Sequence, residues 1–479
     1  MLPVYLLKCF CKHDLHSSLN DHSISKPNGW SFWCNKKYSD MNIFIYCNNR
    51  VIDTQLQVFF YLYNHDTKWR KTMKKMFIDK HISQFSCINS QCEDTCCGNW
   101  AVFVDKKSYE RYESLDQEKS SNLLQFIEKN DPPTSESSYA TIKLTSDGIC
   151  SFLTEEKLCK IHMEYGFYTL CETCKIYPKT TKKINNEYYQ TAYLSCPEMA
   201  RIVLLTQIPF EWNVSVHENP SDFHLIDEVS INRNYMKKTH ENIQSIFKQK
   251  QFSLSQRIWF IGIFISNLYV AIKEKKGTNK AITLAQKQVK KYINRKPHND
   301  IETKMSFLLQ EILKIENFLT GELMNKDITI QRFKECFILF KEGMKMIENE
   351  NIDIKTFIHA YRQNHQTSYH QFFTEHMYIL ENYCSYYFQH ELFPYNIKDL
   401  SKQYLLFVIE FSILKLFLVG ISASSSGLNK NIVIQLFQTY SKLFKHHLKD
   451  KDHHIISIHD QLFKLNRDFY KISDILMSE

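Results

Sequence analysis

Residues 87–97 read Cys87-Ile-Asn-Ser-Gln-Cys92-Glu-Asp-Thr-Cys96-Cys97, and they open the most cysteine-rich part of the chain. Of the fifteen cysteines in the 479 residues, nine fall between Cys87 and Cys196. The nine are Cys87, Cys92, Cys96, Cys97, Cys150, Cys159, Cys171, Cys174 and Cys196. Thiolates are soft ligands that select zinc, cuprous copper or iron–sulfur clusters. The clustering therefore predicts a metal site that uses a subset of these nine thiols.

Three kinds of thiol chemistry compete for this pattern. An iron–sulfur cluster takes four thiolates, often from a tight run plus distant cysteines. A structural zinc site favours paired cysteines two to four residues apart, which Cys92/Cys96 and Cys171/Cys174 would supply. A redox dithiol at Cys171/Cys174 is a weaker interpretation, because no thioredoxin-like βαβ pattern surrounds it. Spacing alone does not decide which cysteines bind.

The composition predicts a folded protein and excludes two common nucleotide-binding folds. Hydrophobic residues make up 43% of the chain, which is enough for a sizeable core. There are only ten glycines, and neither G-x-G-x-x-G nor G-x4-G-K-[S/T] occurs. A Rossmann or P-loop domain is therefore not expected. The net charge of +8 comes without a basic stripe interleaved with aromatics, so we expect no nucleic-acid partner.

The most apolar stretches are Ile258–Ile272 and Leu405–Ile421. Asn267 interrupts the first stretch, and Glu410 and Lys415 interrupt the second. A charge at mid-span is costly in lipid, so both stretches predict buried helices and no membrane span. No signal-peptide pattern is evident, which predicts a cytoplasmic protein. A cytoplasm keeps thiols reduced, so it favours metal binding over disulfides.

The chain predicts an α+β, mostly α fold in three parts. Residues 1–75 match no known pattern, and Met73 and Met76 follow them directly. We predict that translation starts at one of these methionines and that the upstream segment is a mis-called extension. The alternative is a small ordered N-terminal appendage.

Residues 76–205 form a small cysteine-rich metal-binding region, and residues 206–479 form a large helical region. In the first we expect strands at Trp100–Val104 and Tyr139–Leu144, with a helix at Lys107–Lys129 between them. In the second, apolar residues recur at helical spacing, and Ser253-Leu-Ser-Gln256 predicts a capping box.

A set of segments in and beyond the cysteine-rich region follows one family pattern: Phe85–Cys97 with Trp100 and Val102, Asp147–Leu153, Leu158–His162, Leu170–Cys174 with Tyr177-Pro-Lys179, Leu194–Glu198, Glu381–Tyr383, Glu391–Pro394 and the helix after Gln403. Together these segments resemble the flagellin lysine-N-methylase family. The resemblance covers residues 76–479 and is most specific at 85–198. Three departures stand out: Ser151 replaces an expected proline, Lys179 replaces an expected arginine, and Gly98-Asn-Trp100 permutes the expected order. None removes a candidate metal ligand.

The resemblance implies a protein-lysine N-methyltransferase that transfers a methyl group from S-adenosylmethionine to lysine ε-amines of flagellin. It also implies an iron–sulfur cluster, of the 4Fe–4S type, with zinc as the alternative. A second interpretation is a non-enzymatic zinc- or iron–sulfur-binding protein that transfers electrons or docks a partner. The sequence indicates no oligomeric state.

The sequence does not identify the methyl-donor pocket or the catalytic base. Carboxylates and tyrosines can orient an attacking amine, so Glu93, Asp94 and Tyr383 are candidates near the resembling motifs. The simpler alternative is that Glu93 and Asp94 hydrogen-bond the cysteine loop and that Tyr383 packs between helices. A radical mechanism would call for C-x3-C-x2-C, but Asn99 stands where the third cysteine is needed. We therefore favour polar methyl transfer.

Overall fold

The computed structural model describes most of the chain in separate ranges. They are residues 24–26, 30–37, 40–47, 50–52, 74–98, 100–133, 135–156, 158–184, 187–208, 210–217, 226–229, 233–321, 330–347, 353–393, 400–444 and 469–478. The chain divides into two units, residues 1–74 with 216–219, and residues 75–215 with 220–479. Met73 and Asn99, which entered the sequence predictions, lie outside the described residues.

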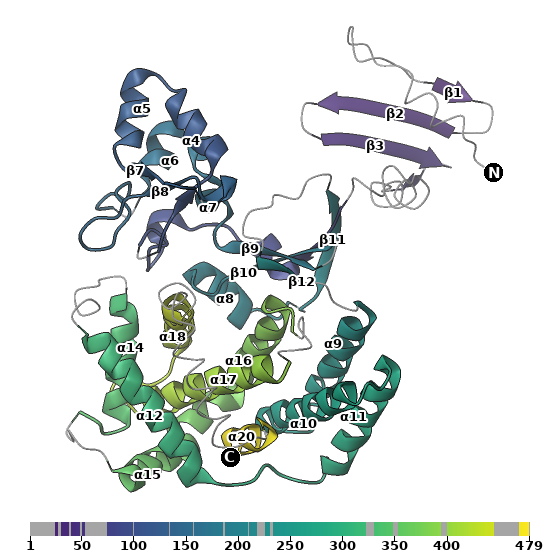
Figure 1. The fold of residues 1–479 in the computed structure, drawn as a ribbon, viewed down its shortest axis with the longest axis vertical. Coiled ribbons are helices and arrows are strands. Elements are labelled where there is room, and N and C mark those ends of the chain that lie inside the picture. The colour runs from purple at the N-terminus through teal and green to yellow at the C-terminus, as the bar shows by residue number, and fades with distance from the viewer. Residues whose placement is uncertain are drawn as a thin grey trace. The chain divides into compact units, whose positions relative to one another are not determined.

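The first unit holds a four-stranded antiparallel sheet in the order β1-β2-β3-β4 (Figure 1). Its strands are Ile24–Lys26, Trp30–Lys37, Asp40–Cys47 and Arg50–Ile52. The hairpin of β2 and β3 pairs Trp30 with Cys47 and Lys37 with Asp40. The sequence analysis predicted no such elements, because the segment shows no sustained periodicity. The proposed downstream start of translation stays a prediction.

The second unit contains two further sheets. One has the order β11-β5-β10-β9-β12, and the other has the order β6-β8-β7. The strands of the first are Lys74–Asp79 (β5), Lys179–Ile184 (β9), Glu187–Ala192 (β10), Trp212–His217 (β11) and Ile226–Val229 (β12). Strands β9 and β10 form an antiparallel hairpin, and β5 pairs with β10 in parallel. The five-stranded sheet was not predicted.

The three-stranded sheet corresponds to the two strands that the sequence predicted. Phe103–Val104 (β6) and Ala140–Ile142 (β8) lie inside the expected stretches but are shorter, and Ile127–Lys129 (β7) completes the sheet. Two helices, Lys106–Glu113 (α4) and Gln117–Leu124 (α5), lie between them.

The prediction of one helix over Lys107–Lys129 is wrong. The side chain of Asp116 accepts a hydrogen bond from the backbone N–H of Lys119, so it caps a second helix. The hydroxyl of Ser114 donates to the carbonyl of Arg111, where the first helix ends. The last three residues of the expected helix form β7 instead.

The remaining elements of the second unit are helical, and they confirm the α+β, mostly α fold class. Three short helices follow the cysteines: Lys160–Tyr165 (α6), Glu172–Ile176 (α7) and Pro197–Leu205 (α8). The larger helices are Arg233–Phe247 (α9), Leu254–Lys273 (α10), Thr278–Tyr292 (α11), Ile301–Thr320 (α12), Gln331–Gly343 (α14), Ile354–Asn364 (α15), His370–His390 (α16), Leu400–Ser422 (α17), Lys430–Lys442 (α18) and Phe469–Leu476 (α20). Ser253 and Gln256 form the predicted capping box at the start of α10.

Helices α10 and α17 lie at the centre of the helical region. Both are long and apolar enough to cross a membrane by length and composition, but 67% and 83% of their apolar windows are buried inside the protein. Helix α17 packs against α10, α12, α14, α15, α18 and α20. This burial agrees with the prediction that both stretches are core helices.

Helix α8 joins the cysteine-rich part to this helical core. It packs against α16 and α18, and its residues Met199, Ala200, Val203 and Leu204 are buried in the same hydrophobic core as α10 and α17. In Figure 1, α8 lies between the strands β9 and β10 and the long helices α16, α17 and α18. The predicted boundaries at 75/76 and 205/206 stay predictions.

Helices α14 and α17 approach each other closely at two glycines. A Cβ atom built on Gly343 would overlap the carbonyl oxygen of Gly420. We expect Gly343→Ala to lower the free energy of unfolding by about 1–3 kcal/mol, because the overlap forces backbone shifts in a packed core. Chemical denaturation measures this. Gly277→Ala is the matched control, since nothing lies within 4 Å of its Cβ position, and equal losses in both variants would contradict the explanation.

Candidate functional site

Of the nine clustered cysteines, Cys174 lies inside the short helix α7, and the others lie in loops or directly before short helices. Cys92 follows the 3₁₀ turn Asn89–Gln91, and Cys96 and Cys97 follow four and five residues later. Cys150 forms an isolated β-bridge with Leu144, and its N–H donates to the carbonyl of Cys97 at 2.9 Å. This backbone bond joins the first cysteine motif directly to the second.

Three of the cysteines occupy the N-cap positions of helices. Cys159 begins α6, Cys171 begins α7 and Cys196 begins α8. The free N–H groups at a helix N-terminus favour a thiolate over a thiol. The sequence analysis did not foresee this placement, because none of the three is a usual capping residue.

All nine are free thiols, and they differ in exposure. Cys150, Cys171 and Cys196 are buried, Cys92, Cys97, Cys159 and Cys174 are half-buried, and Cys87 and Cys96 are exposed. The structure therefore brings seven of the nine into the protein and leaves Cys87 and Cys96 exposed.

Six of these thiols are electrostatic neighbours of one another. The pKa of Cys97 is raised well above its ordinary value by its hydrogen bond with Cys96, by burial, and by charge on Cys96, Cys150 and Cys159. The pKa of Cys174 is raised in the same way by its hydrogen bond with Cys171, by burial, and by charge on Cys171, Cys97 and Cys159. We call these six residues the thiol cluster: Cys96, Cys97, Cys150, Cys159, Cys171 and Cys174.

Cys92 and Cys196 are linked to the thiol cluster through Cys96, because charge on Cys96 acts to raise the pKa of both. Burial raises the pKa of Cys196 to about 12, and charge on Cys92 or Cys96 acts in the same direction. Burial also raises the pKa of Cys92. Buried thiols of this kind stay protonated in the metal-free protein, whereas a bound metal ion deprotonates them outright.

Cys96 behaves in the opposite way. The hydrogen bond from the Cys97 thiol, with 4.0 Å between the sulfurs, lowers the pKa of Cys96 to about 7. Desolvation of the sulfur opposes this change, although Cys96 as a whole residue is exposed, and the nearby Lys442 ammonium supports it. Cys96 is therefore the member of the pair that forms a thiolate first.

The donors gathered in the thiol cluster suit a soft metal. Within the described ranges, no three His, Cys, Asp or Glu side chains stand at the distances of a formed metal site. The thiol cluster nevertheless offers more than the four thiolates that a zinc or iron–sulfur centre takes. The residues present fit such a group chemically, and the metal site stays a prediction.

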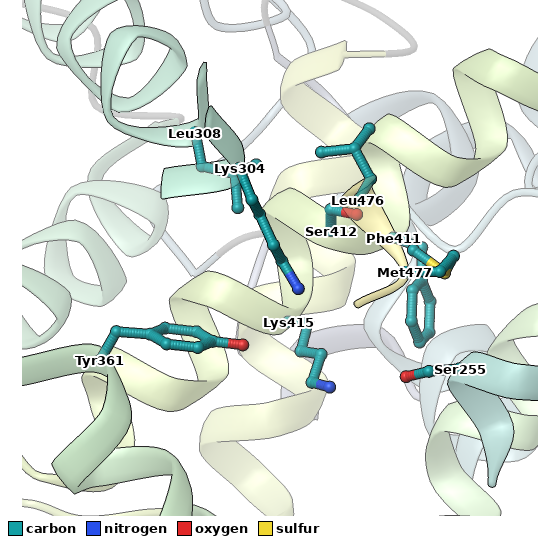
Figure 2. A pocket seen from close by; sticks show the side chains of 9 residues that line it. All are labelled: Ser255, Lys304, Leu308, Tyr361, Phe411, Ser412, Lys415, Leu476 and Met477. Carbon is teal, nitrogen blue, oxygen red and sulfur yellow. The ribbon is translucent and has the colours of Figure 1, made fainter. Parts of the chain in front are cut away.

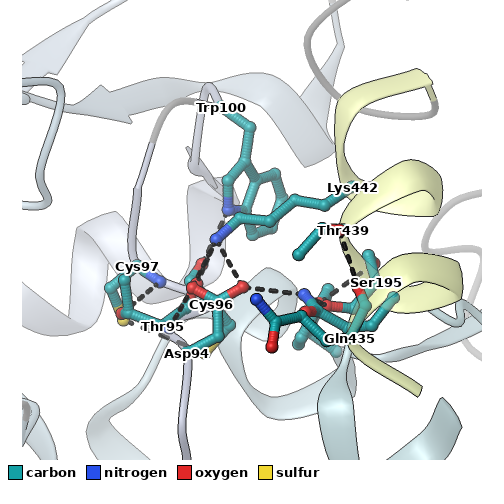
Figure 3. A network of polar contacts seen from close by, with 11 residues as sticks. Asp94, Thr95, Cys96, Cys97, Trp100, Ser195, Gln435, Thr439 and Lys442 are labelled. Atoms are coloured by element: carbon teal, nitrogen blue, oxygen red, sulfur yellow. Dashed lines mark hydrogen bonds and ion pairs between the residues drawn. The ribbon is translucent and has the colours of Figure 1, made fainter. Parts of the chain in front are cut away.

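Asp94, a candidate from the sequence, lies at the centre of a buried polar network (Figure 3). The Lys442 ammonium donates to both carboxylate oxygens of Asp94 at 2.9 and 3.0 Å, and to the carbonyl of Thr95 at 2.9 Å. The Gln438 amide donates to Asp94 Oδ2 at 2.7 Å, and the N–H of Thr95 donates to Oδ1 at 2.7 Å. The carboxylate thus holds the cysteine loop against α18.

Glu93, its neighbour, points to a different partner. Arg201 of α8 donates to Glu93 Oε1 at 2.6 Å and also pairs with Glu198. This arginine therefore fixes the other side of the same loop to α8. All three side chains are half-buried.

Tyr383 lies in α16, inside the helical core. Its hydroxyl donates to Glu410 Oε1 at 2.7 Å, and its ring packs on Phe437 of α18 at 4.8 Å. Burial and the Glu410 carboxylate raise the pKa of Tyr383 well above its ordinary value. The hydroxyl is accordingly a hydrogen-bond donor here, and the catalytic roles suggested for Glu93, Asp94 and Tyr383 stay predictions.

Two aromatic residues line the same region as the loop. Trp100 Nε1 donates to the carbonyl of Cys96 at 2.7 Å, and its ring lies 5.8 Å from that of Tyr177. The Tyr177 hydroxyl lies 3.1 Å from Ser195 Oγ, immediately before Cys196. Aromatic contacts therefore connect the first motif, the end of α7 and the start of α8.

The sequence analysis missed Gln438, Lys442 and Arg201. A usable signal existed for the first two: they lie four residues apart on α18, among Val433, Phe437 and Tyr440, which are buried. Two polar side chains within an apolar helix face call for buried partners. The sequence does not say that these partners lie some 340 residues earlier.

A separate small cavity lies among the helices (Figure 2). Its lining comes from α10, α12, α15, α17 and the end of α20: Ser255, Lys304, Leu308, Tyr361, Phe411, Ser412, Lys415, Leu476 and Met477. The Lys304 ammonium donates to the carbonyl of Ser478. None of these helices carries a cysteine of the thiol cluster, so the cavity belongs to the helical core.

Comparison with known proteins gives consistent similarities. A family model described as FliB lysine N-methylase C-terminal domain matches residues 240–466. The chain is 30% identical over 128 residues to the Lysine-N-methylase of Salmonella typhimurium (strain LT2), which is 26% of this chain and 31% of that protein. It is also 30% identical over 128 residues to the Flagellar biosynthetic protein FliU of Salmonella muenchen, with 73% of that protein covered. The match thus spans less than a third of the lysine-N-methylase relative. No solved structure matches.

The Lys442–Asp94 pair yields a stability prediction. Both side chains are at most 7% exposed, so Lys442→Met would leave a buried, uncompensated carboxylate. We expect this change to lower the free energy of unfolding by about 3–5 kcal/mol in urea denaturation. Lys430→Met removes an exposed lysine from the start of the same helix and should change stability by less than about 0.5 kcal/mol. Comparable losses in the two variants would refute the assigned role of the pair.

Proposed function

Because the chain belongs to the flagellin lysine-N-methylase family, we propose that it methylates lysine ε-amines of flagellin with S-adenosylmethionine as the methyl donor. The observation that carries the proposal is the family match over residues 240–466 together with the relatives named Lysine-N-methylase. The matched relatives are longer than the shared segment, so the activity of the whole protein is our proposal. The thiol cluster supports it as the second feature that resembles this family.

The proposed reaction places clear demands on the site. The lysine nitrogen attacks the sulfonium methyl carbon, the carbon–sulfur bond breaks, and the nitrogen loses a proton. A free lysine has a pKa of about 10.4, so the site must desolvate the amine or offer a base. It must also align nitrogen, carbon and sulfur. These steps are polar and need no radical, so we favour a polar transfer.

We further propose that the thiol cluster holds a 4Fe–4S cluster, with zinc as the alternative. The ligands would be drawn from Cys96, Cys97, Cys150, Cys159, Cys171 and Cys174, because charge on members of this set raises the pKa of Cys97, Cys174 and Cys150 within it. Cys92 and Cys196 lie beside this set, and Cys87 is exposed. When bound, either group would cross-link the loop at residues 92–97 to the starts of α6 and α7. Only the 4Fe–4S cluster could also store one electron, because zinc has no redox chemistry.

The proposed cellular site is the cytoplasm. All nine clustered cysteines are free thiols, and a reducing compartment keeps them available for a metal. Flagellin subunits would be accessible there before their assembly. Two apolar helices are mostly buried within the protein and give no support for a membrane location.

The decisive experiment is a transfer assay with purified protein, flagellin monomer and S-adenosylmethionine that carries a labelled methyl group. We expect label on flagellin lysines, identified by peptide mass spectrometry, and none on flagellin whose lysines have been blocked chemically. A protein that carries its metal fully and transfers no label would refute the proposal. That result would favour the second interpretation, a metal-binding protein without enzymatic activity.

The metal proposal is tested by a matched pair of cysteine variants. Cys150 and Cys336 are both buried free thiols, but only Cys150 belongs to the thiol cluster. We expect Cys150→Ser to lose most of the bound iron and visible absorbance, because it removes a soft ligand. Cys336→Ser should keep both, and equal iron content in the two variants would contradict the assignment.

A further inference from the structure

Helix α18 contacts two cysteine motifs that are a hundred residues apart in sequence. Gln438 Nε2 donates to Asp94 Oδ2 at 2.7 Å and to the carbonyl of Ser195 at 2.9 Å. Asp94 lies between Cys92 and Cys96, and Ser195 directly precedes Cys196. One fully buried amide therefore bridges the first cysteine motif and the last.

Lys442, one turn farther along α18, adds a second connection to the first motif. Its ammonium bonds the carboxylate of Asp94 and the carbonyl of Thr95. The hydroxyl of Thr95 in turn accepts a hydrogen bond from the N–H of Cys97 at 3.0 Å. A chain of short polar contacts thus runs from α18 to the backbone of Cys97 (Figure 3).

The orientation of the Gln438 amide is fixed by its partners. Both neighbours, a carboxylate oxygen and a carbonyl oxygen, are acceptors, so the NH₂ group must face them. Among the described residues, Oε1 of Gln438 is buried without a hydrogen-bond partner. Leaving Oε1 buried without a partner costs desolvation free energy. The side chain keeps this position nevertheless, which indicates that the two hydrogen bonds made by Nε2 determine its placement.

We infer that Gln438 and Lys442 are positioning residues that hold the Asp94–Cys97 and Ser195–Cys196 segments where their thiols meet the thiol cluster. Only the presence of a bound metal in this inference rests on the proposed function. The positioning follows from contacts within the protein. The helical region then acts on the metal site directly, because α18 supplies the clamp.

The test introduces one negative charge with almost no change of shape. Gln438→Glu places a carboxylate against Asp94 and the carbonyl of Ser195, so both segments should be pushed away. Gln435→Glu is the matched control: Gln435 lies on the same helix and donates to the carbonyl of Arg332 and to Glu335 of α14. The control therefore introduces the same kind of charge repulsion, with no change of shape, at a position that does not contact the cysteine loop.

The first readout is the alkylation rate of each cysteine in the reduced, metal-free, full-length protein, followed by peptide mass spectrometry. In Gln438→Glu we expect the rates at Cys97 and Cys196 to rise several-fold, while buried Cys336 stays unchanged. In Gln435→Glu the rates at Cys97 and Cys196 should match the wild type. A folded Gln438→Glu protein with wild-type rates at Cys97 and Cys196 would overturn the inference.

Rescue separates positioning from general loss of stability. The double variant Asp94→Asn with Gln438→Glu exchanges amide and carboxylate between the partners, so one hydrogen bond forms again and the new carboxylate lies one turn from Lys442. We expect partial return of the wild-type alkylation rates. A double variant no better than the single one would count against the clamp. If Gln438→Glu does not fold, Gln438→Leu is used instead, because it removes both hydrogen bonds without adding a charge. In this variant the alkylation rates at Cys97 and Cys196 should also rise, while the rate at Cys336 stays unchanged.

The second readout is iron content and visible absorbance after reconstitution. Loss in Gln438→Glu with retention in Gln435→Glu supports the clamp, and equal content in both overturns it. If the wild-type protein itself binds no metal, the proposed metal site has failed. The alkylation rates then still decide whether α18 positions the thiols, so the two failures are distinguishable.

Discussion

The buried carboxylate of Asp94 is the constraint on which the cysteine-rich part depends. It accepts hydrogen bonds from Thr95, Gln438 and Lys442, and both it and the lysine are nearly excluded from solvent. A charge in such surroundings is tolerated only when it is paired and fully hydrogen-bonded. The loop that carries four cysteines can therefore fold in this way only once α18 is in place.

Helix α18 owes its own position to the apolar core. Its buried face packs on α8, α14 and α17, and α17 in turn contacts most of the other long helices. Such burial contributes roughly 1.5–3 kcal/mol for each large apolar side chain. Burial of apolar side chains thus stabilises the position of α18, and the polar network aligns the cysteine segments against this helix.

The sequence predicted the features that depend on local patterns. Helical periodicity identified the apolar helices, and the Ser253–Gln256 capping box marks the start of α10. The break in the helix after Glu113 was missed because the sequence around it favours a continuous helix. A single residue, Asp116, overrides this preference by capping a new helix through its side-chain carboxylate. The β9–β10 hairpin was missed because its strands, KTTKKI and EYYQTA, are polar enough to resemble a loop.

For the candidate site, the sequence predicted the residue type but not the arrangement. The clustered thiols were evident from composition alone, and Asp94 drew attention by its place between Cys92 and Cys96. Its partners Gln438 and Lys442 lie more than 340 residues away, and no local pattern encodes a pairing over that distance. The roles of Arg201 and Ser195 depend on the same tertiary folding.

Three of the thiols belong to N-cap residues, directly before the first residue of a helix: Cys159, Cys171 and Cys196. Because each of these residues directly precedes its helix, the distances between their backbones depend on the relative tilt of α6, α7 and α8. Helix α8 also packs on α16 and α18. A metal held at the starts of α6 and α7, beside the start of α8, would therefore respond to any partner that shifts the helical region, and the occupied centre would in turn stiffen the surface that such a partner meets.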